Sequence, residues 1–458
     1  MNGKIPSFLV GTVCLALLAS ACGSDDSDNP ADSSPKSTKS ITVAASDVKV
    51  ADPAAAKTQP LPGESEATGT PIKIGFPYTD WEALKQAGYP LAFRTDDEEQ
   101  IDALVDWANA HGGIAGHPID PVPVKVTTVD PNALQAACLK MTQEEKTALV
   151  VDVGVFIGNP SCVVQQNNTP MLTTFPGSDS EYLKQFPKLS GGAATLEQAA
   201  TDLIGGGAEM GFFDIPGKLG ILRNGCDPDS VWDGPNGVYA LLKQLGITSD
   251  DYVEYKNACD FAVTAGKTAT QALLAFKAAN VTKVIAGTGS AMEKTVSAQG
   301  QRQGFQPAWL IGDFASTIQN TTLLNNDNID GAYGVSGTAL TYEGSESAAL
   351  CDEIFTGAGL PAMKGIDVDL SAAYHCDAVV QMVQIGALMD KDAEVTTESY
   401  AEAAQKAGNL FSAQTYGVTY GEGDMLGADK VGLFRYDADK KAWKQQGETI
   451  VAPHVPQS

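Results

Sequence analysis

The chain has 458 residues, of which 30 are Lys or Arg and 56 are Asp or Glu, so its formal charge is −26. This length suits two or three domains, and the charge argues against a nucleic acid partner, because phosphate backbones attract basic proteins. Four scattered histidines, with no His-Glu-x-x-His or Cys-x-x-Cys pattern, give a metal site no support. We therefore expect neither a metal nor another cofactor.

The N-terminus resembles an export signal. Lys4 precedes an apolar stretch at residues 5–18 that is too short to span a bilayer as a mature helix. Three small residues then lead to Cys22, a pattern similar to a bacterial lipobox, in which Cys22 carries a lipid and becomes the first mature residue. The alternative is an ordinary secretory signal cut near Ala21. Residues 1–21 are thus a predicted signal peptide, and the protein is expected outside the cytoplasm, anchored to the bacterial cell membrane.

Residues 22–70 are rich in Ser, Asp, Ala, Pro, Lys and Thr and poor in large apolar side chains. Such a segment buries too little apolar surface to offset the entropy lost on ordering. The sequence therefore predicts a lipidated, disordered tether with a reach of about 40 Å.

Six cysteines follow the tether, and an exported protein can pair them: Cys138, Cys162, Cys226, Cys259, Cys351 and Cys376. Sequence alone leaves many pairings open. Short separations favour 138 with 162, 226 with 259 and 351 with 376, each bridge stabilising the fold by about 3 kcal/mol in the chain-entropy model.

From residue 71 onward, apolar strands alternate with helical patterns. The first strands are expected at 72–76, 124–128, 149–155 and from 170, with helices at 98–110 and 132–143. After a connection at 186–194, helices are expected at 196–204, 235–245, 262–279 and 291–303, and strands at 219–223, 253–255, 281–286, 309–311 and 332–336. Helices at 345–356, 371–389 and 399–407 and a hairpin at 418–436 follow. Strands separated by such helices pair in parallel through right-handed crossovers, which predicts two α/β units.

The stretch from 148 to 174 combines a strand, a polar break, a short helix and a second strand. Ligands of open parallel sheets bind beyond the carboxyl ends of the strands, where helix N-termini offer free N–H groups. Asn159 and Ser161 stand at such a place. The alternative is that both side chains only cap the helix.

The end of the predicted helix at 98–110 and the residues after it resemble a signature of type I periplasmic solute-binding proteins. These proteins are the receptors of ABC importers and include branched-chain amino acid receptors. The sequence that carries the resemblance is DALVDWANAHGGIAGHPI. Segments 72–80, 129–154, 169–179 and 285–305 follow in the family's order. The resemblance implies an α/β fold of two doubly wound parallel-sheet lobes joined by a multi-strand hinge. It places lobe I at 71–188 with 334–411, lobe II at 189–333 with 412–450, and a tail at 451–458, so each proposed disulfide lies within one lobe.

The resemblance also implies ligand-binding residues. A ligand carboxylate would be held near Asn159, Ser161, Thr174 and Ser178, and Asp313 would meet an ammonium group. A solvated turn is the alternative for Asp313.

The opening loop brings Tyr78 and Trp81, either as ligand contacts or as packing residues. Segments 224–226 and 288–290 lack the aromatic residues of relatives that bind branched-chain amino acids, although Trp232 is near the first. We therefore expect an aromatic, amide or other small organic solute instead of leucine, isoleucine or valine.

These features predict a binding protein that delivers a small solute to a membrane ABC permease. A receptor that senses the solute without transport is the alternative. An extracellular hydrolase is not favoured, because the sequence has neither a Gly-x-Ser-x-Gly elbow nor a His-Glu-x-x-His pattern.

Overall fold

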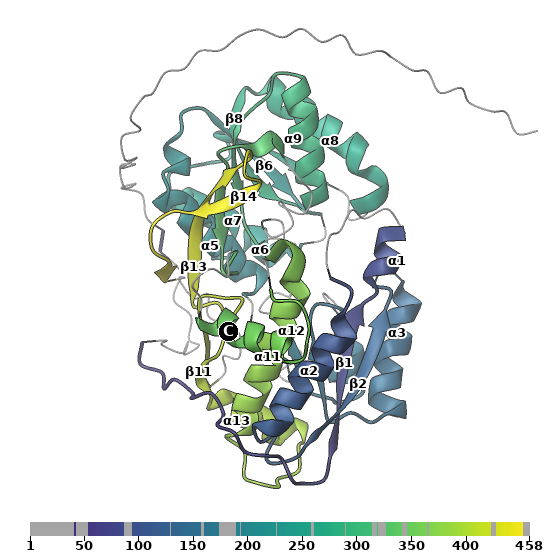
Figure 1. Cartoon of the computed structure of the whole chain (residues 1–458). Helices are drawn as coiled ribbons and strands as arrows, with labels where there is room; N and C mark the ends of the chain where they lie inside the picture. The colour runs from purple at the N-terminus through teal and green to yellow at the C-terminus, as the bar shows by residue number, and fades with distance from the viewer. Residues whose placement is uncertain are drawn as a thin grey trace, which may run out of the picture. The chain divides into compact units, whose positions relative to one another are not determined.

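The computed structural model describes residues 41–42, 54–86, 94–128, 130–156, 160–173, 189–192, 194–225, 227–257, 261–288, 290–313, 318, 327–340, 346–363, 366–422 and 427–451. The predicted signal peptide and Cys22 lie outside these residues. Two α/β regions, here called lobe I and lobe II, are each built around one main sheet (Figure 1).

Lobe I contains a parallel sheet with the order β2-β1-β3-β4-β5. Its strands are β1 (Ile72–Thr79), β2 (Ile119–Val126), β3 (Leu149–Asp152), β4 (Met171–Thr173) and β5 (Leu189–Gly191). Its helices are α1 (Trp81–Gln86), α2 (Asp97–Ala110), α3 (Pro131–Leu139), α11 (Glu346–Gly357), α12 (Ile366–Gly386) and α13 (Thr397–Gln405), with π-helical turns at Lys140–Glu144 and Cys162–Gln166. Strand β5 lies within the stretch 186–194 that was predicted as a connection, so this short strand was not predicted from the sequence.

Lobe II contains a sheet with the order β14-β13-β10-β9-β8-β6-β7, and β15 pairs with β13. Its strands are β6 (Lys218–Arg223), β7 (Tyr252–Lys256), β8 (Val281–Gly287), β9 (Ala308–Ile311), β10 (Tyr333–Ser336), β13 (Lys430–Asp437), β14 (Ala442–Gln445) and β15 (Ile450–Val451). Its helices are α5 (Leu196–Glu209), α6 (Asp229–Asp233), α7 (Val238–Gln244), α8 (Phe261–Ala278) and α9 (Ser290–Arg302). Strands β6 to β10 are parallel, which confirms the predicted fold class, and β13 adds an antiparallel edge.

The predicted hairpin at 418–436 is wrong. Strand β12 (Val418–Tyr420) pairs with β11 (Gly408–Leu410), whereas β13 pairs with β10, β14 and β15. The reason is burial: Val418 packs into a core of lobe I, and Leu433 packs into a core of lobe II. The two strands therefore belong to different sheets, and the last strand, β15, takes in a residue that the sequence assigned to the tail.

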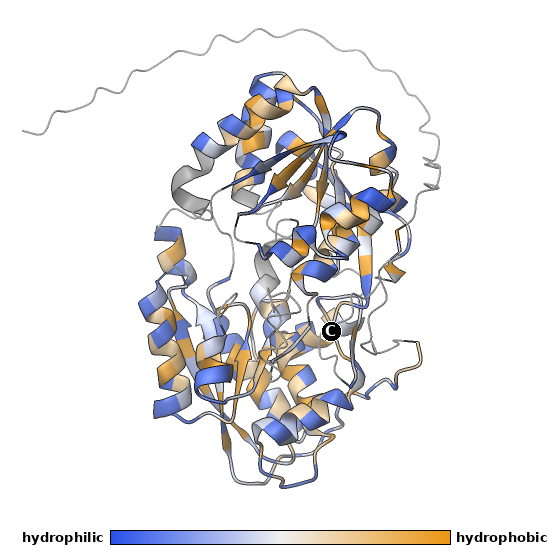
Figure 2. Cartoon of the chain, turned by 180° about the vertical axis from the view of Figure 1, so that it is seen from behind, coloured by the Kyte–Doolittle hydropathy of each residue, from blue (hydrophilic) through white to orange (hydrophobic). Residues whose placement is uncertain are grey.

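Both main sheets are covered by apolar side chains on their two faces. In β3, Val150 and Val151 point to different core clusters of lobe I, as neighbours in a strand do. In β6, Ile221 and Leu222 divide in the same way between two clusters of lobe II. Figure 2 shows the result, with apolar strands inside and polar residues on the outer faces of the helices.

Residues 54–70, predicted as part of a disordered tether, are ordered along lobe I. The Gln59 side chain is buried, and the Gln59 N–H donates to the carbonyl of Asn409 over 2.8 Å. Further along, the N–H groups of Ser65 and Ala67 donate over 2.9 Å to carbonyls near the end of α2. The tether prediction is wrong here because backbone hydrogen bonds, and not apolar burial, hold the segment.

Two predicted disulfides are confirmed. Cys138 pairs with Cys162, and Cys351 pairs with Cys376. The first bond joins α3 to the π-helical turn after β3, and the second joins α11 to α12, so both staple elements of lobe I. Cys226 and Cys259 lie outside the described residues.

Candidate ligand-binding site

Residues at the carboxyl end of β1 form one side of the candidate site. Asp80 follows β1 and accepts the N–H of Ala83 over 3.1 Å, so α1 begins directly after the strand. Trp81 is the first residue of α1, and its side chain is half-buried. The indole Nε1 donates to Oδ1 of Asp97 over 3.4 Å. The aromatic ring is therefore held at the carboxyl end of the sheet, where a ligand of this fold class would lie.

Tyr78 occupies a different environment. Its side chain is 5% exposed and packs in the same core cluster as Ile74 and Phe76. Its hydroxyl donates to Oε2 of Glu98 over 3.0 Å, and burial followed by this hydrogen bond raises the pKa of Tyr78 well above its usual value. The structure thus places Tyr78 in the packing role that the sequence left open. Its two-residue spacing from Ile74 and Phe76 was the signal for that role.

Asp97 was not singled out from the sequence, although it connects three helices. Its side chain is 2% exposed and accepts hydrogen bonds from Trp81 of α1 and from the hydroxyl of Ser371 in α12. Burial raises the pKa of Asp97 to about 6, and the two hydrogen bonds oppose that rise. Asp97 therefore fixes the position of the indole at the strand edge.

A second buried carboxylate belongs to Asp152, the last residue of β3. Its Oδ1 accepts the N–H groups of Val155 and Phe156 over 2.9 and 3.2 Å, and its Oδ2 accepts the hydroxyl of Thr173 over 3.2 Å. Burial raises the pKa of Asp152 to about 6. No local pattern predicts this contact, because it depends on β3 and β4 being neighbours in the sheet.

Ser161 lies just before the π-helical turn that follows β3. Its side chain is half-buried and makes no capping hydrogen bond to that turn, so the capping alternative does not hold for Ser161. Asn159, Thr174 and Ser178, the other predicted contacts in lobe I, lie outside the described residues.

Asp313 follows β9 in lobe II and bridges two strand ends. Its Oδ1 accepts the hydroxyl of Ser336, and its Oδ2 accepts the N–H of Gly337, each over 2.7 Å. The half-buried carboxylate is thus tied to the chain where it leaves β10. Asp313 is therefore not simply a solvated residue in a turn. Burial raises the pKa of Asp202, and the negative charge of Asp313 raises it further.

The loops after β6 and β8 contain segments 224–226 and 288–290, which lack the aromatic residues that the family resemblance implied. Here Trp232 is fully buried, and its Nε1 donates to Oδ2 of Asp227 over 3.0 Å. The side chain of Asn224 donates to the other oxygen of Asp227 over 2.9 Å. Trp232 therefore packs in the lobe II core. In the described part of this loop, Asn224 is the polar residue that directly follows β6.

Three crossings of the chain connect the lobes: residues 191–196, 336–346 and 420–430. The loop between β11 and β12, which precedes the third crossing, is held by the buried Asp377, whose carboxylate accepts the Ser412 hydroxyl over 2.7 Å and the N–H of Gln414 over 3.2 Å. The N–H of Gly427 donates to the carbonyl of Gly191 over 2.8 Å, so the first and third crossings lie together. Several chain crossings between two lobes are the usual basis of hinge closure.

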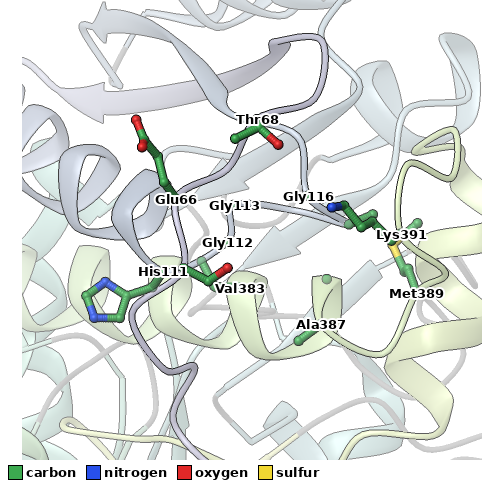
Figure 3. Close-up of a pocket in the computed structure, with 13 residues that line it drawn as sticks. Glu66, Thr68, His111, Gly112, Gly113, Gly116, Val383, Ala387, Met389 and Lys391 are labelled. Atoms are coloured by element: carbon green, nitrogen blue, oxygen red, sulfur yellow. The ribbon is translucent and has the colours of Figure 1, made fainter.

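A cavity of about 230 Å³ lies at the opposite end of the lobe I strands from the candidate site. Figure 3 shows Glu66, Thr68, His111 and Lys391 among its lining residues. His111 and its neighbours lead into the start of β2, so this cavity is at the amino ends of the strands. It is not part of the candidate site, since ligands of such sheets bind beyond the carboxyl ends.

No described helix is long and apolar enough to cross a membrane. No group of three or more His, Cys, Asp or Glu side chains in the described ranges could hold a metal ion.

The fold is that of type I periplasmic solute-binding proteins. A solute-binding protein of an ABC transporter from Rhodopseudomonas palustris HaA2, in complex with p-hydroxybenzoic acid, superposes with a TM-score of 0.61 at 15% identity, covering 83% of this chain and 97% of its own. A branched-chain amino acid ABC transporter protein from Thermus thermophilus, with bound valine, gives a TM-score of 0.60 at 13% identity over 84% and 97%.

A third solved structure, a leucine-binding protein from Thermotoga maritima, gives a TM-score of 0.58 at 11% identity over 83% of this chain and 99% of its own. No protein-family model and no curated protein sequence matches the chain. At these identities the likeness establishes the fold, and it spans almost the whole of each relative.

Proposed function

We propose that the protein is the extracytoplasmic solute-binding component of an ABC importer, anchored to the membrane by a lipid on Cys22. The observation that carries this proposal is the fold: two parallel-sheet lobes with three crossings, similar over nearly their full lengths to solute-binding proteins of ABC transporters. The lipobox-like sequence before Cys22 supports the location. The protein would act by binding and presenting its solute, not as an enzyme.

The solute would lie between the carboxyl ends of the two sheets. In lobe I, Trp81 and Ser161 are the described candidates for contact, and Asn159, Thr174 and Ser178 remain sequence-based candidates. In lobe II, Asp313 would meet a positively charged or hydrogen-bond-donating group. A half-buried indole at the end of β1 favours a planar or apolar part of the solute. A small amino acid, amide or aromatic compound satisfies these requirements.

The test is thermal unfolding of the mature chain, screened against amino acids, amides and aromatic acids including 4-hydroxybenzoate. A solute present at one hundred times its dissociation constant stabilises the folded state by about 2.7 kcal/mol, which shifts the unfolding temperature by several degrees. No shift with any compound, after refolding to remove solute carried over from the cell, would count against the proposal.

Variants then locate the site. Ser161→Ala and Asp313→Ala should weaken binding of the solute found in the screen by at least tenfold. Glu402→Ala is the matched control, because Glu402 is exposed on α13 and forms an ion pair with Lys406 of the same helix. Equal affinities for the three variants would move the site away from the strand ends.

A further inference from the structure

Gln244, the last residue of α7 in lobe II, forms hydrogen bonds with the chain's own N-terminal segment. The N–H of Thr42 donates to Oε1 of Gln244 over 2.7 Å, and Nε2 of Gln244 donates to the carbonyl of Thr42 over 2.8 Å. One side-chain amide thus satisfies both backbone groups of one residue, as a neighbouring strand would do. More than two hundred positions separate the partners, so this is a tertiary contact.

Ile41 extends the same contact onto α5. Its side chain packs against the core cluster that contains Leu203 and Leu241. It also approaches Gly205 so closely that a Cβ atom at Gly205 would lie 3.2 Å from Cδ1 of Ile41.

Gly205 belongs to a run of three glycines inside α5, although glycine is an unfavourable residue in the interior of a helix. Gly206 and Gly207 are explained by the sheet, because a Cβ atom at either would lie 2.7 Å from a side chain of a strand. A Cβ atom at Gly205 would meet, among the described residues outside its own helix, only Ile41 within 4 Å. The small residue at this position therefore matches the docked isoleucine.

The same segment is fixed to lobe I further along. Gln59 is buried, its side chain donates to the carbonyl of Ala407, and its own carbonyl accepts Nε2 of Gln384 over 3.1 Å. Backbone N–H groups at Ser65 and Gly69 add two more hydrogen bonds of 2.9 Å. The contact with lobe I is therefore extensive and partly buried, whereas Gln244 and Thr42 on lobe II are exposed.

We propose that the α5–α7 surface centred on Gly205 and Gln244 is a docking site for Ile41 and Thr42, which makes the N-terminal segment a releasable tie between the two lobes. The chain that leaves Thr42 continues to residues 54–70, so one covalent segment is attached to both lobes in addition to the three crossings. The lobe II end is the releasable end, because its hydrogen bonds are open to competing water. The tie limits the separation of the lobes while it is docked.

The first test measures hydrogen exchange at the Thr42 amide in the full mature chain. Gln244→Ala removes the acceptor, and Gly205→Leu fills the space that Ile41 occupies, so each should accelerate exchange at Thr42 at least tenfold. The amides of Ser65 and Ala67 should be unaffected. Lys243→Ala is the control, since Lys243 is the exposed neighbour of Gln244 in α7. Unchanged exchange at Thr42 in both variants would overturn the docking site.

The second test measures the distance between the lobes without any solute. Spin labels on cysteines introduced at the exposed Asp106 of α2 and Leu274 of α8 report the distance distribution. Ile41→Asp is the principal variant, because Ile41 lies outside the described helices and strands and its replacement leaves α5 and α7 intact. It should broaden the distribution relative to Lys243→Ala, and identical distributions would overturn the tie. Because no solute is used, failure of the transport proposal would leave this result unaffected.

Discussion

In the described parts of the two lobes, different contacts hold the segments beyond the strands. In lobe I, the disulfides Cys138–Cys162 and Cys351–Cys376 link helices and turns covalently. In the described part of lobe II, the end of β6 is held by a polar and aromatic network. The guanidinium group of Arg223 lies 5.2 Å from the ring of Trp232, and Asp227 accepts the indole N–H. A covalent link acts mainly on the unfolded chain, whereas such a network needs every partner in place.

The largest expected effect follows from this dependence. Trp232→Ala removes a fully buried ring, the surface beneath Arg223 and the donor to Asp227, so it should lower the free energy of unfolding by about 3–5 kcal/mol. Denaturant unfolding would measure the loss. Trp107→Ala is the matched change in lobe I, where the ring is half-buried and stacks on His111. Equal losses would mean that the lobe II network has no special importance.

Removing one of the two disulfides of lobe I should have the next largest effect. The double variant Cys138→Ala with Cys162→Ala opens a loop with a sequence separation of 24 and should cost about 3 kcal/mol. Hydrogen exchange should rise in α3 and β3, while the strands of lobe II keep their protection. A uniform rise over both lobes would show that the bridge stabilises the whole molecule and not its own lobe.

The comparison also explains what could be predicted from sequence. Alternating apolar segments predicted the longer helices and most of the parallel strands of both lobes, because each element must bury one face. Short elements such as α1, α6 and β5 were missed. The pairing of 138 with 162 and of 351 with 376 followed from short separations. The hairpin at 418–436 was wrong because local patterns do not tell which sheet receives a strand. Residues 54–70 were misjudged because their order comes from backbone hydrogen bonds, which composition does not reveal.

The candidate site was less accessible to sequence reasoning. Trp81 follows the end of β1 closely, and its role as a ligand contact stays a prediction. Tyr78 could have been assigned to the core from its spacing with Ile74 and Phe76. Asp97 and Asp152 could not be found, since their partners come from α12 and from the neighbouring strand β4. Such contacts depend on the three-dimensional order of elements and leave no local pattern.

A smaller effect tests a feature that the lobes share. Burial raises the pKa of Asp152 in lobe I and of Asp227 in lobe II, each to about 6 from an ordinary value of 3.8. The folded protein therefore holds protons that the unfolded chain releases between about pH 4 and pH 6. The contribution of each group is present below its unfolded pKa and is lost as the pH rises through its folded pKa.

Asp152→Asn isolates one of these contributions. The asparagine Oδ1 can still accept the N–H groups of Val155 and Phe156, and its amide can donate to Thr173. Relative to this variant, the wild-type protein should lose about 1–2 kcal/mol of unfolding free energy between pH 5 and pH 8. Parallel stability curves for the two proteins would show that burial does not shift the pKa of Asp152.

The smallest effect compares two polar residues that precede helical segments. In lobe II, the Thr195 hydroxyl accepts the N–H of Gln198 over 3.1 Å and caps α5. In lobe I, Ser161 makes no such capping bond. Thr195→Ala should therefore cost about 1 kcal/mol of stability, while Ser161→Ala should stay within about 0.5 kcal/mol of the wild-type value. Thermal unfolding of both variants without solute, followed by titration with the solute identified in the screen, separates stability from binding. A stability loss for Ser161→Ala as large as that for Thr195→Ala would give Ser161 a structural role and weaken its assignment as a ligand contact.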